Sequence, residues 1–302
     1  MAAFRLALIS MPWPLANRPS IQLGALKSFI ESKAAEVKID CYHLYLEVGN
    51  LLGLKAYNDI AERTWVAESV YAYLLNPKRR PEITALVSKE YSAKTKGDPP
   101  NLENISKQIQ RLHQEKHLNL AWSSYDLIGF SICLSQLTSS LFMIREIRRR
   151  HPHCPIVVGG SSCAGELGYS LLANSPEIDF VVSGEGELPL LTLVARIKSG
   201  DFKGVDSAGL LWRDEQGNIT GGGMKQLSKL TELPVPDYTD YFEQLRGQSR
   251  LSNLIPNLPV ETSRGCWWHR VKSGAVDRAC KFCNLNLQWR GYRSKEPIQV
   301  AR

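Results

Sequence analysis

The sequence contains no apolar run long enough to span a bilayer, and its N-terminus, MAAFRLALISMPWPL, has no small-residue cleavage site. The first absence excludes a membrane-spanning helix, and the second excludes a secretory signal peptide. With 43% hydrophobic and 22% charged residues over 302 positions, the composition is that of a globular protein large enough for two domains. We therefore expect a cytoplasmic protein with no membrane partner.

A disulfide framework is also excluded, because the cysteine count is odd and no export signal precedes it. Seven cysteines are present. Cys41, Cys133, Cys154 and Cys163 lie in or beside apolar, strand-like segments, where we interpret them as small buried residues or exposed thiols. The other three cluster near the C-terminus, which indicates a different role.

Nucleic-acid motifs are likewise missing, although the net charge is +7. The surplus is confined to the segment from Arg246 to Arg302, where 11 Lys and Arg residues stand against 3 Asp and Glu residues. This segment has no aromatic-and-basic repeat, so we expect no nucleic-acid partner. We predict instead that it faces an anionic cofactor or an acidic peptide, with solvated surface charge as the alternative.

The first two thirds of the chain alternate strand-like apolar runs with helical periods. This alternation predicts an α/β fold with a doubly wound, five-stranded parallel sheet covered on both faces. The predicted strands are Phe4 to Ser10, Val37 to Leu44, Leu127 to Cys133, Ile156 to Val158 and Phe180 to Ser183. The predicted helices are 21–33, 139–150, 166–173 and 188–198. The ligand of such a sheet lies beyond the carboxyl ends of the strands, where the strand order reverses.

Two stretches depart from the alternation. Residues 45–122 are long and helix-prone, and we interpret them as a helical insertion that is surface decoration, a cap on the ligand site or a partner contact. Further on, GLLWRDEQGNITGGG predicts a hairpin, and Pro234 and Pro236 mark an extended connector. The predicted division is a first domain at 1–204, a hairpin and linker at 205–253, and the start of a second domain at 254–302.

Three loops at predicted strand ends are small and polar: SICLSQLTSS, GGSSCAGELG and SGEGE. Gly159 and Gly160 admit positive φ and carry no Cβ, so a bulky flat cofactor can lie against them. Each loop alone is also explained as a turn into the next helix. The occurrence of all three loops, each after a predicted strand, indicates a cofactor site more strongly than any one loop does.

Together, YDLIGFSICLSQLTSSL, PIVVGGSSC and IDFVVSGEGE resemble the N-terminal cobalamin-binding domain of radical S-adenosylmethionine (SAM) proteins. The resemblance implies that cobalamin is bound by Ser131, Leu134, Ser135, Gln136, Gly159, Gly160, Ser161, Gly184, Glu185 and Gly186. One departure concerns the loop after the first strand, SMPWPLANRPSIQLG, which lacks the Asp-x-His-x-x-Gly of cobalamin-dependent mutases and methionine synthase. We therefore expect that no histidine from this loop coordinates the lower face of the cobalt. The sequence does not identify which group, if any, is the lower ligand.

Near the C-terminus, Cys266 is followed after thirteen residues by Cys280 and after two more by Cys283. Three thiolates can hold a 4Fe-4S cluster and leave one iron open for an outside ligand. The alternatives are a zinc site with His269 as fourth ligand and unliganded cysteines. The aromatic Phe282 inside the Cys-x-x-Cys, the strand-like LPVETSRGC and the preceding domain favour the cluster.

This segment resembles a radical SAM subgroup that matures ribosomally made, post-translationally modified peptides (RiPPs). The matching elements are SRGCWW at 263–268, Cys-x-Phe-Cys-x-Leu-Asn at 280–286 and RSK-x-P at 293–297, although the loop between the first two cysteines is longer than usual. The resemblance implies a partial (β/α) barrel, with S-adenosylmethionine and Phe282 at the cluster. It further implies a precursor peptide as substrate and a flavodoxin or ferredoxin as electron donor.

The sequence ends soon after RSK-x-P, before the further strand-helix units of such a barrel. We therefore expect a C-terminally truncated chain that is inactive alone. Its parent would be a cobalamin-dependent radical SAM methyltransferase acting on an unactivated carbon of a ribosomal peptide precursor, with catalytic side chains that the sequence does not identify. The alternative is a non-catalytic cobalamin- or peptide-binding module.

Overall fold

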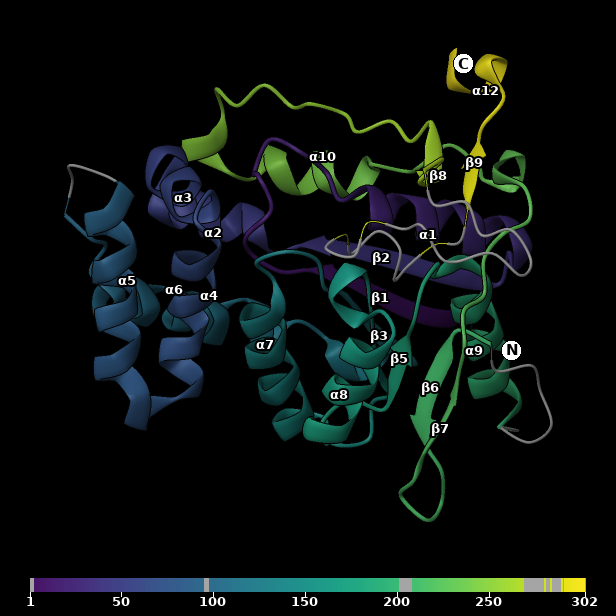
Figure 1. Cartoon of the computed structure of the whole chain (residues 1–302), viewed down its shortest axis with the longest axis horizontal. Coiled ribbons are helices and arrows are strands. Elements are labelled where there is room, and N and C mark those ends of the chain that lie inside the picture. Colours follow the sequence, from purple (N-terminus) through teal and green to yellow (C-terminus); the bar gives the residue numbers. More distant parts are fainter. Residues whose placement is uncertain are drawn as a thin grey trace.

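The computed structural model describes residues 3–94, 98–200, 208–268, 280, 283, 289 and 291–301. Within these residues the largest sheet has seven strands in the order β2-β1-β3-β4-β5-β6-β7 (Figure 1). The strands are β1 (Phe4–Ser10), β2 (Val37–His43), β3 (Leu127–Ser131), β4 (Ile156–Gly159), β5 (Phe180–Val182), β6 (Leu210–Arg213) and β7 (Ile219–Gly222).

The sheet corrects the predicted count of five strands. β1 to β5 pair in parallel and coincide with the predicted strands. The predicted hairpin, β6 and β7, pairs antiparallel with β5 instead of standing apart, through contacts such as Val181 with Leu211. The free edge of β5 can pair with another strand through its backbone N–H and C=O groups. Sequence periodicity does not reveal such a pairing.

Helices cover both faces of the sheet, as predicted. On one face lie α1 (Ile21–Lys33) and α9 (Glu187–Ser199), and on the other lie α7 (Leu137–Arg150) and α8 (Glu166–Asn174). Successive side chains of β1 point to opposite faces: Leu6 and Leu8 join the core beneath α1 and α9, whereas Ile9 joins the core beneath α7 and α8. Each such buried side chain contributes about 1.5–3 kcal/mol.

The strand order reverses at β1, which lies between β2 and β3. Ser10 at the end of β1 pairs with His43 of β2 and with Ser131 of β3, and Ser131 pairs with Gly159 of β4. The carboxyl ends of four strands therefore reach the same edge, where a ligand site of a doubly wound sheet is expected.

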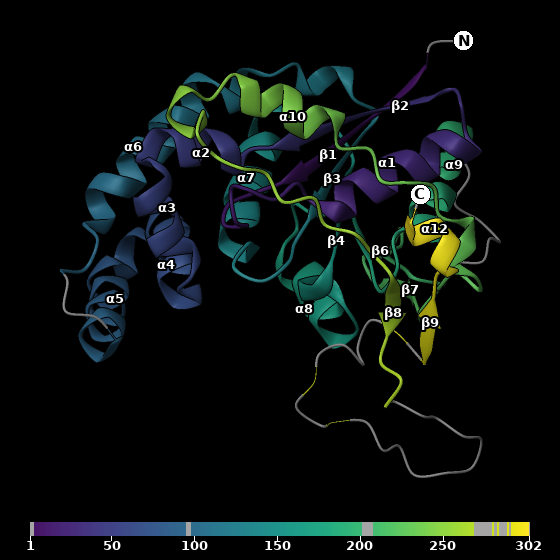
Figure 2. The same cartoon turned by 90° about the horizontal axis from the view of Figure 1, so that it is seen from above.

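The insertion is helical, as predicted, and packs on the flank of the sheet. It contains α2 (Tyr45–Leu52), α3 (Leu54–Ala61), α4 (Thr64–Leu75), α5 (Arg80–Lys94) and α6 (Leu102–Glu115). The Glu68 carboxylate of α4 accepts hydrogen bonds from the N–H groups of Leu137 (3.1 Å) and Thr138 (2.8 Å) at the start of α7. Both views place these helices at the end of the molecule away from β8 and β9 (Figure 2).

The C-terminal third returns across the sheet through α10 (Thr239–Arg246) and then forms a two-stranded ribbon, β8 (Ser263–Gly265) and β9 (Tyr292–Ser294), before α12 (Pro297–Ala301). In α10, the Gln244 side chain accepts from His43 N at 2.8 Å and donates to Cys41 O at 2.6 Å. These two bonds satisfy groups on the outer edge of β2.

Short 3₁₀ helices complete the described elements: η1 (Pro77–Arg79), η2 (His117–Asn119), η3 (Trp122–Ser124), η4 (Ser161–Cys163), η5 (Leu230–Glu232) and η6 (Ser249–Leu251). No helix in the described ranges combines the length and the apolar character that crossing a bilayer demands.

Candidate functional site

A cavity of about 620 Å³ opens at the carboxyl edge of β3, β4 and β5 and extends beneath α1 and α9. Its inner part is apolar, and its mouth is rimmed by the polar strand-end loops. The apolar lining includes Leu8, Leu23, Leu26, Val157, Val182 and Leu190. The connector and the cysteine segment complete the lining with Pro259, Val260, Glu261, Arg264 and Trp289. The described residues of the insertion are absent from this lining, so they do not cap the cavity.

Gly129 forms part of the cavity wall, although it was not among the predicted cofactor residues. It lies inside the buried strand β3, where a Cβ would come within 2.9 Å of Leu8 Cδ2 and 3.4 Å of Val157 Cγ1. A glycine inside a strand marks a place where something approaches the backbone closely. The sequence Leu-Ile-Gly-Phe-Ser carried this signal.

Gly159, the last residue of β4, and Gly160, which follows it, have different roles, which corrects the idea that both offer a bare floor through positive φ. Gly159 lacks positive φ, and its Cβ would meet Val182 at 3.3 Å, on the wall of the cavity. Gly160 has φ +105°, and its Cβ would lie 2.6 Å from the Ile132 carbonyl oxygen. Glycine is required at 160 by the neighbouring backbone.

The loop after β3 is fixed by Gln136. Its side-chain amide donates to Ser10 Oγ at 3.0 Å and to Met11 O at 2.6 Å, and its carbonyl oxygen accepts from Cys133 N at 3.0 Å. The loop is thereby tied to the end of β1, and Ser135 is held at φ +62°.

The predicted cofactor residues divide into two groups. The larger group lines the cavity and comprises Ser131, Gly159, Gly160, Ser161, Gly184, Glu185 and Gly186. The remaining loop residues lie outside the lining: Ser135 and Gln136 are buried, and Leu134 is 74% exposed. Contact of these three with a cofactor stays a prediction.

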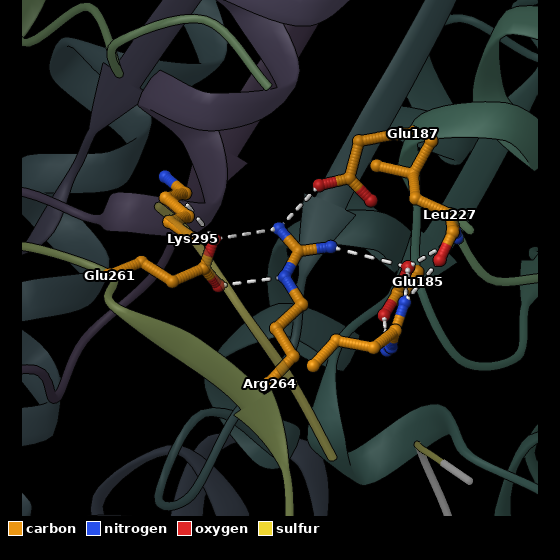
Figure 3. A network of polar contacts seen from close by, with 7 residues as sticks. Glu185, Glu187, Leu227, Glu261, Arg264 and Lys295 are labelled. Carbon is orange, nitrogen blue, oxygen red and sulfur yellow. Dashed lines mark hydrogen bonds and ion pairs between the residues drawn. The ribbon is translucent and has the colours of Figure 1, made fainter. Parts of the chain in front are cut away.

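The two glutamates of the GEGE segment belong to a buried ionic network, with Arg264 at its centre (Figure 3). Arg264 contacts Glu187 at 2.6 Å, Glu261 at 2.7 Å and Glu185 at 3.4 Å. Arg293 also pairs with Glu185, and Lys295 lies 3.8 Å from Glu261. Three cations thus face three carboxylates.

Because these charges are buried, each one needs a partner of opposite sign. A buried charge that loses its partner strongly destabilises the folded protein. Glu185, Glu187 and Arg264 expose 4%, 3% and 8% of their surface. Burial acts to lower the pKa of Arg264, but the hydrogen bonds and charges of Glu187 and Glu261 outweigh it and raise the pKa above its ordinary value. Arg264 is therefore a permanent cation at the cavity wall.

Cys266 directly follows β8, and Cys283 N donates a hydrogen bond to Cys280 O at 3.0 Å. All three cysteines are partly exposed. Across the described residues, which include these cysteines, no three His, Cys, Asp or Glu side chains gather as a metal site. Phe282 and His269 lie outside the described residues.

Three of the remaining cysteines are buried, in agreement with their interpretation as small apolar residues. Burial raises the pKa of the Cys154 thiol to about 11, and it raises those of Cys41 and Cys163 above the ordinary value as well. These thiols stay protonated at neutral pH and are poor metal ligands. Cys133 is partly exposed beside the cavity.

No protein-family model matches the chain. It is 26% identical over 180 residues to an uncharacterized methyltransferase, PH0819, of Pyrococcus horikoshii, an alignment that covers 58% of this chain and 35% of that protein. Among solved structures it resembles the cobalamin-dependent S-adenosylmethionine radical enzyme OxsB, at TM-score 0.56 and 17% identity over 98% of this chain and 30% of OxsB.

A second similar structure is the radical S-adenosylmethionine methyltransferase TsrM from Kitasatospora setae, at TM-score 0.55 and 14% identity. That match covers 100% of this chain and 45% of TsrM. The chain thus spans less than half the length of each of these proteins. The likeness confirms a fold shared with cobalamin-dependent radical SAM enzymes, as the sequence motifs predicted, whereas the RiPP subgroup stays a prediction.

Proposed function

We propose that this chain is the cobalamin-binding part of a radical SAM methyltransferase, together with the adjoining cysteine segment. The observation that carries the proposal is the cavity of about 620 Å³ at the strand-order reversal, with Gly129 in its wall. The similarity to OxsB, TsrM and the methyltransferase PH0819 supports it.

The residues present fit a cobalamin. A cavity of this volume takes a drug-sized group rather than a whole corrinoid, so it suits the aromatic base of the nucleotide tail and leaves the corrin ring at the mouth. The apolar wall formed by Leu23, Val157 and Leu190 suits such a base, and Ser131 and Ser161 offer hydroxyl groups at the mouth. The absence of a Cβ at Gly129 keeps the wall open.

A dinucleotide is the rival ligand for a doubly wound sheet, and the loop after β1 disfavours it. Dinucleotide sites use a glycine-rich turn there to approach the pyrophosphate. In this chain, residues 11–20 read MPWPLANRPS and contain no glycine. None of the lining residues is a histidine, so the described residues of the cavity supply no imidazole to cobalt. His43, at the end of β2, is buried against Tyr45 and Tyr241 instead.

The cysteine segment is assigned to a 4Fe-4S cluster that binds S-adenosylmethionine, with Cys266, Cys280 and Cys283 as ligands and Phe282 beside it. Bound together, these groups would supply the radical that activates a substrate carbon and the methyl group that cobalamin carries. We propose a ribosomal precursor peptide as substrate and a flavodoxin or ferredoxin as electron donor. The contribution of this chain is to bind, orient and shield the cofactors.

Cobalamin binding is tested by mixing the chain with hydroxocobalamin, removing the excess by gel filtration and recording the visible spectrum. We expect coloured wild-type protein and colourless Gly129→Val, whose added side chain enters the cavity. Gly247→Ala is the matched control, because its Cβ would meet nothing closer than 3.5 Å. A colourless wild type that is folded by circular dichroism would exclude the proposed site.

The cluster is tested by anaerobic reconstitution with iron and sulfide. We expect a brown protein whose visible absorbance is largely lost when Cys266, Cys280 or Cys283 is replaced by Ala. Cys154→Ala is the control, since this thiol is buried and stays protonated. Stoichiometric zinc in a protein that refuses iron would contradict the assignment.

A further inference from the structure

The GEGE, SRG and RSK motifs meet in a single ionic network, although Arg264 of the SRG motif lies 77 positions beyond Glu187 of the GEGE segment. Glu185 lies in the loop between β5 and α9, and Glu187 is the first residue of α9, in the predicted first domain. Arg264 and Arg293 are cross-strand partners on the β8–β9 ribbon. Two like charges at paired positions repel each other unless carboxylates lie between them.

Glu185 supplies carboxylate oxygens to both arginines and to a backbone group. Its Oε2 accepts from Leu227 N at 2.8 Å and from Arg293 Nη1 at 3.2 Å, and it lies 3.4 Å from Arg264 Nη1. Its Oε1 pairs with Arg293 Nη2. This carboxylate is therefore fully engaged by the protein, which leaves it little capacity to bind a cofactor.

The network connects the cavity to the cysteine segment over a very short path. Arg264 and Glu187 both line the cavity, and Cys266 is two residues beyond Arg264. Gly265 between them has φ +81°, and its Cβ would come within 1.9 Å of Gly291 O, so the two strands of the ribbon are in close contact here. Because Cys266 lies only two residues beyond Arg264, the contacts that hold Arg264 also limit the positions that Cys266 can take.

We propose that Glu185 and Glu187 are positioning residues, which lock the ribbon bearing Cys266 onto the wall of the cavity. The clamp consists of Glu185, Glu187, Glu261, Arg264, Arg293 and Lys295. It fixes the first cysteine relative to the cavity and makes the ribbon part of the ligand site. Its relevance to methyl transfer rests on the proposed function, whereas the clamp itself rests on the contacts alone.

The clamp is tested by amide hydrogen exchange, followed by mass spectrometry, on the whole chain without cofactors. Glu187→Gln removes one carboxylate charge while keeping the side-chain shape. Exchange in peptides that contain Ser263 to Gly265 and Tyr292 to Ser294 should then accelerate at least about tenfold, since local opening of the ribbon becomes easier. Exchange in β3 and β4 should not change, which shows that the variant is folded. Glu36→Gln is the control, because it removes a carboxylate from an exposed pair with Lys198.

A double variant distinguishes a charge clamp from a general packing effect. In Glu187→Gln/Arg264→Gln, both members of the pair are neutral, and Glu185 and Glu261 keep Arg293 and Lys295 as their partners. Protection of the ribbon should be at least partly restored relative to Arg264→Gln alone. Unchanged ribbon exchange in Glu187→Gln, or purely additive losses in the double variant, would overturn the clamp.

Hydroxocobalamin titration then separates positioning from direct binding. We expect the Glu185→Gln variant to bind hydroxocobalamin and so remain coloured, while the amides of β8 and β9 exchange faster than in wild type. Loss of colour with an intact ribbon would make Glu185 a cofactor ligand and refute its positioning role. If the wild type binds no cobalamin, the proposed function fails, and the exchange measurements still decide whether the clamp exists.

Discussion

Replacing Gly160 by Ala is expected to destabilise the fold without acting through a ligand. At φ +105° and ψ −176°, Gly160 occupies a region that only glycine adopts readily, and strain there costs roughly 1–3 kcal/mol. The new Cβ would also lie 2.6 Å from Ile132 O and 3.0 Å from Ile132 N, where backbone and not a flexible side chain must move. Such overpacking typically costs a further ~1–3 kcal/mol.

These two contributions sum to a loss of about 2–6 kcal/mol, offset by less than about 1 kcal/mol from the stiffer unfolded chain. We expect a net loss of at least about 1 kcal/mol, which is a measurable part of the ~5–15 kcal/mol that stabilises an ordinary protein. Urea unfolding followed by far-ultraviolet circular dichroism measures it, because a lower midpoint at unchanged slope reports stability alone.

Gly159→Ala is the matched comparison, because it adds the same methyl group one residue earlier. Gly159 lacks positive φ, and its Cβ would meet a side-chain atom, Val182 Cβ, at 3.3 Å. Its stability should stay within about 1 kcal/mol of wild type, while hydroxocobalamin binding weakens because the methyl group enters the cavity wall. If Gly160→Ala unfolds at the wild-type urea concentration, the reasoning about this backbone position is refuted.

Three further outcomes are expected. Burial and the charge of Lys27 lower the pKa of His43 to about 3 in the folded protein, whereas the usual value in an unfolded chain is ~6.5. Between these two pH values the unfolded chain binds the proton more tightly, so protonation favours unfolding. The free energy of unfolding should therefore fall by at most about 1.4 kcal/mol per pH unit below pH ~6.5. Urea midpoints from pH 7 to 4 should fall less steeply in His43→Phe than in wild type or in the exposed control His153→Gln. Gln136→Ala removes three hydrogen bonds, two of them buried, and should lower the free energy of unfolding by roughly 1–3 kcal/mol, with an unchanged urea midpoint as the contrary result. Labelled DNA and RNA should show no submicromolar binding at about 200 mM salt, where phosphate contacts weaken steeply; such binding would overturn the assignment of the basic segment.

Sequence periodicity predicted the parallel strands because most are short, continuous apolar runs, as in Phe4–Ser10, whereas the edge strand β2 (Val37–His43) alternates buried and more exposed positions. The position of the hairpin was not predictable in the same way. The sequence of β6, Leu-Leu-Trp-Arg, favours a strand but does not show which strand edge it joins, and the pairing of Val181 with Leu211 depends on tertiary packing.

The candidate site was only partly predictable. Strand-end glycines and serines indicated the mouth of the cavity, because three small, polar loops follow successive strands whose carboxyl ends meet at one edge of the sheet. The roles of Glu185 and Arg264 depend on a contact across 79 positions of sequence, which motif spacing within one loop cannot reveal. Gly129 was missed because a single glycine inside a strand is also compatible with simple packing.

The most direct test of the account is the location of cobalt in crystals of the chain grown with hydroxocobalamin, measured by anomalous scattering at the cobalt absorption edge. The account predicts one cobalt peak outside the cavity mouth, beyond the carboxyl ends of β3 and β4, with density for the nucleotide tail running past Gly129 into the cavity. A cobalt peak elsewhere on the molecule, or cobalamin in the crystal with the Gly129 cavity free of tail density, would contradict it.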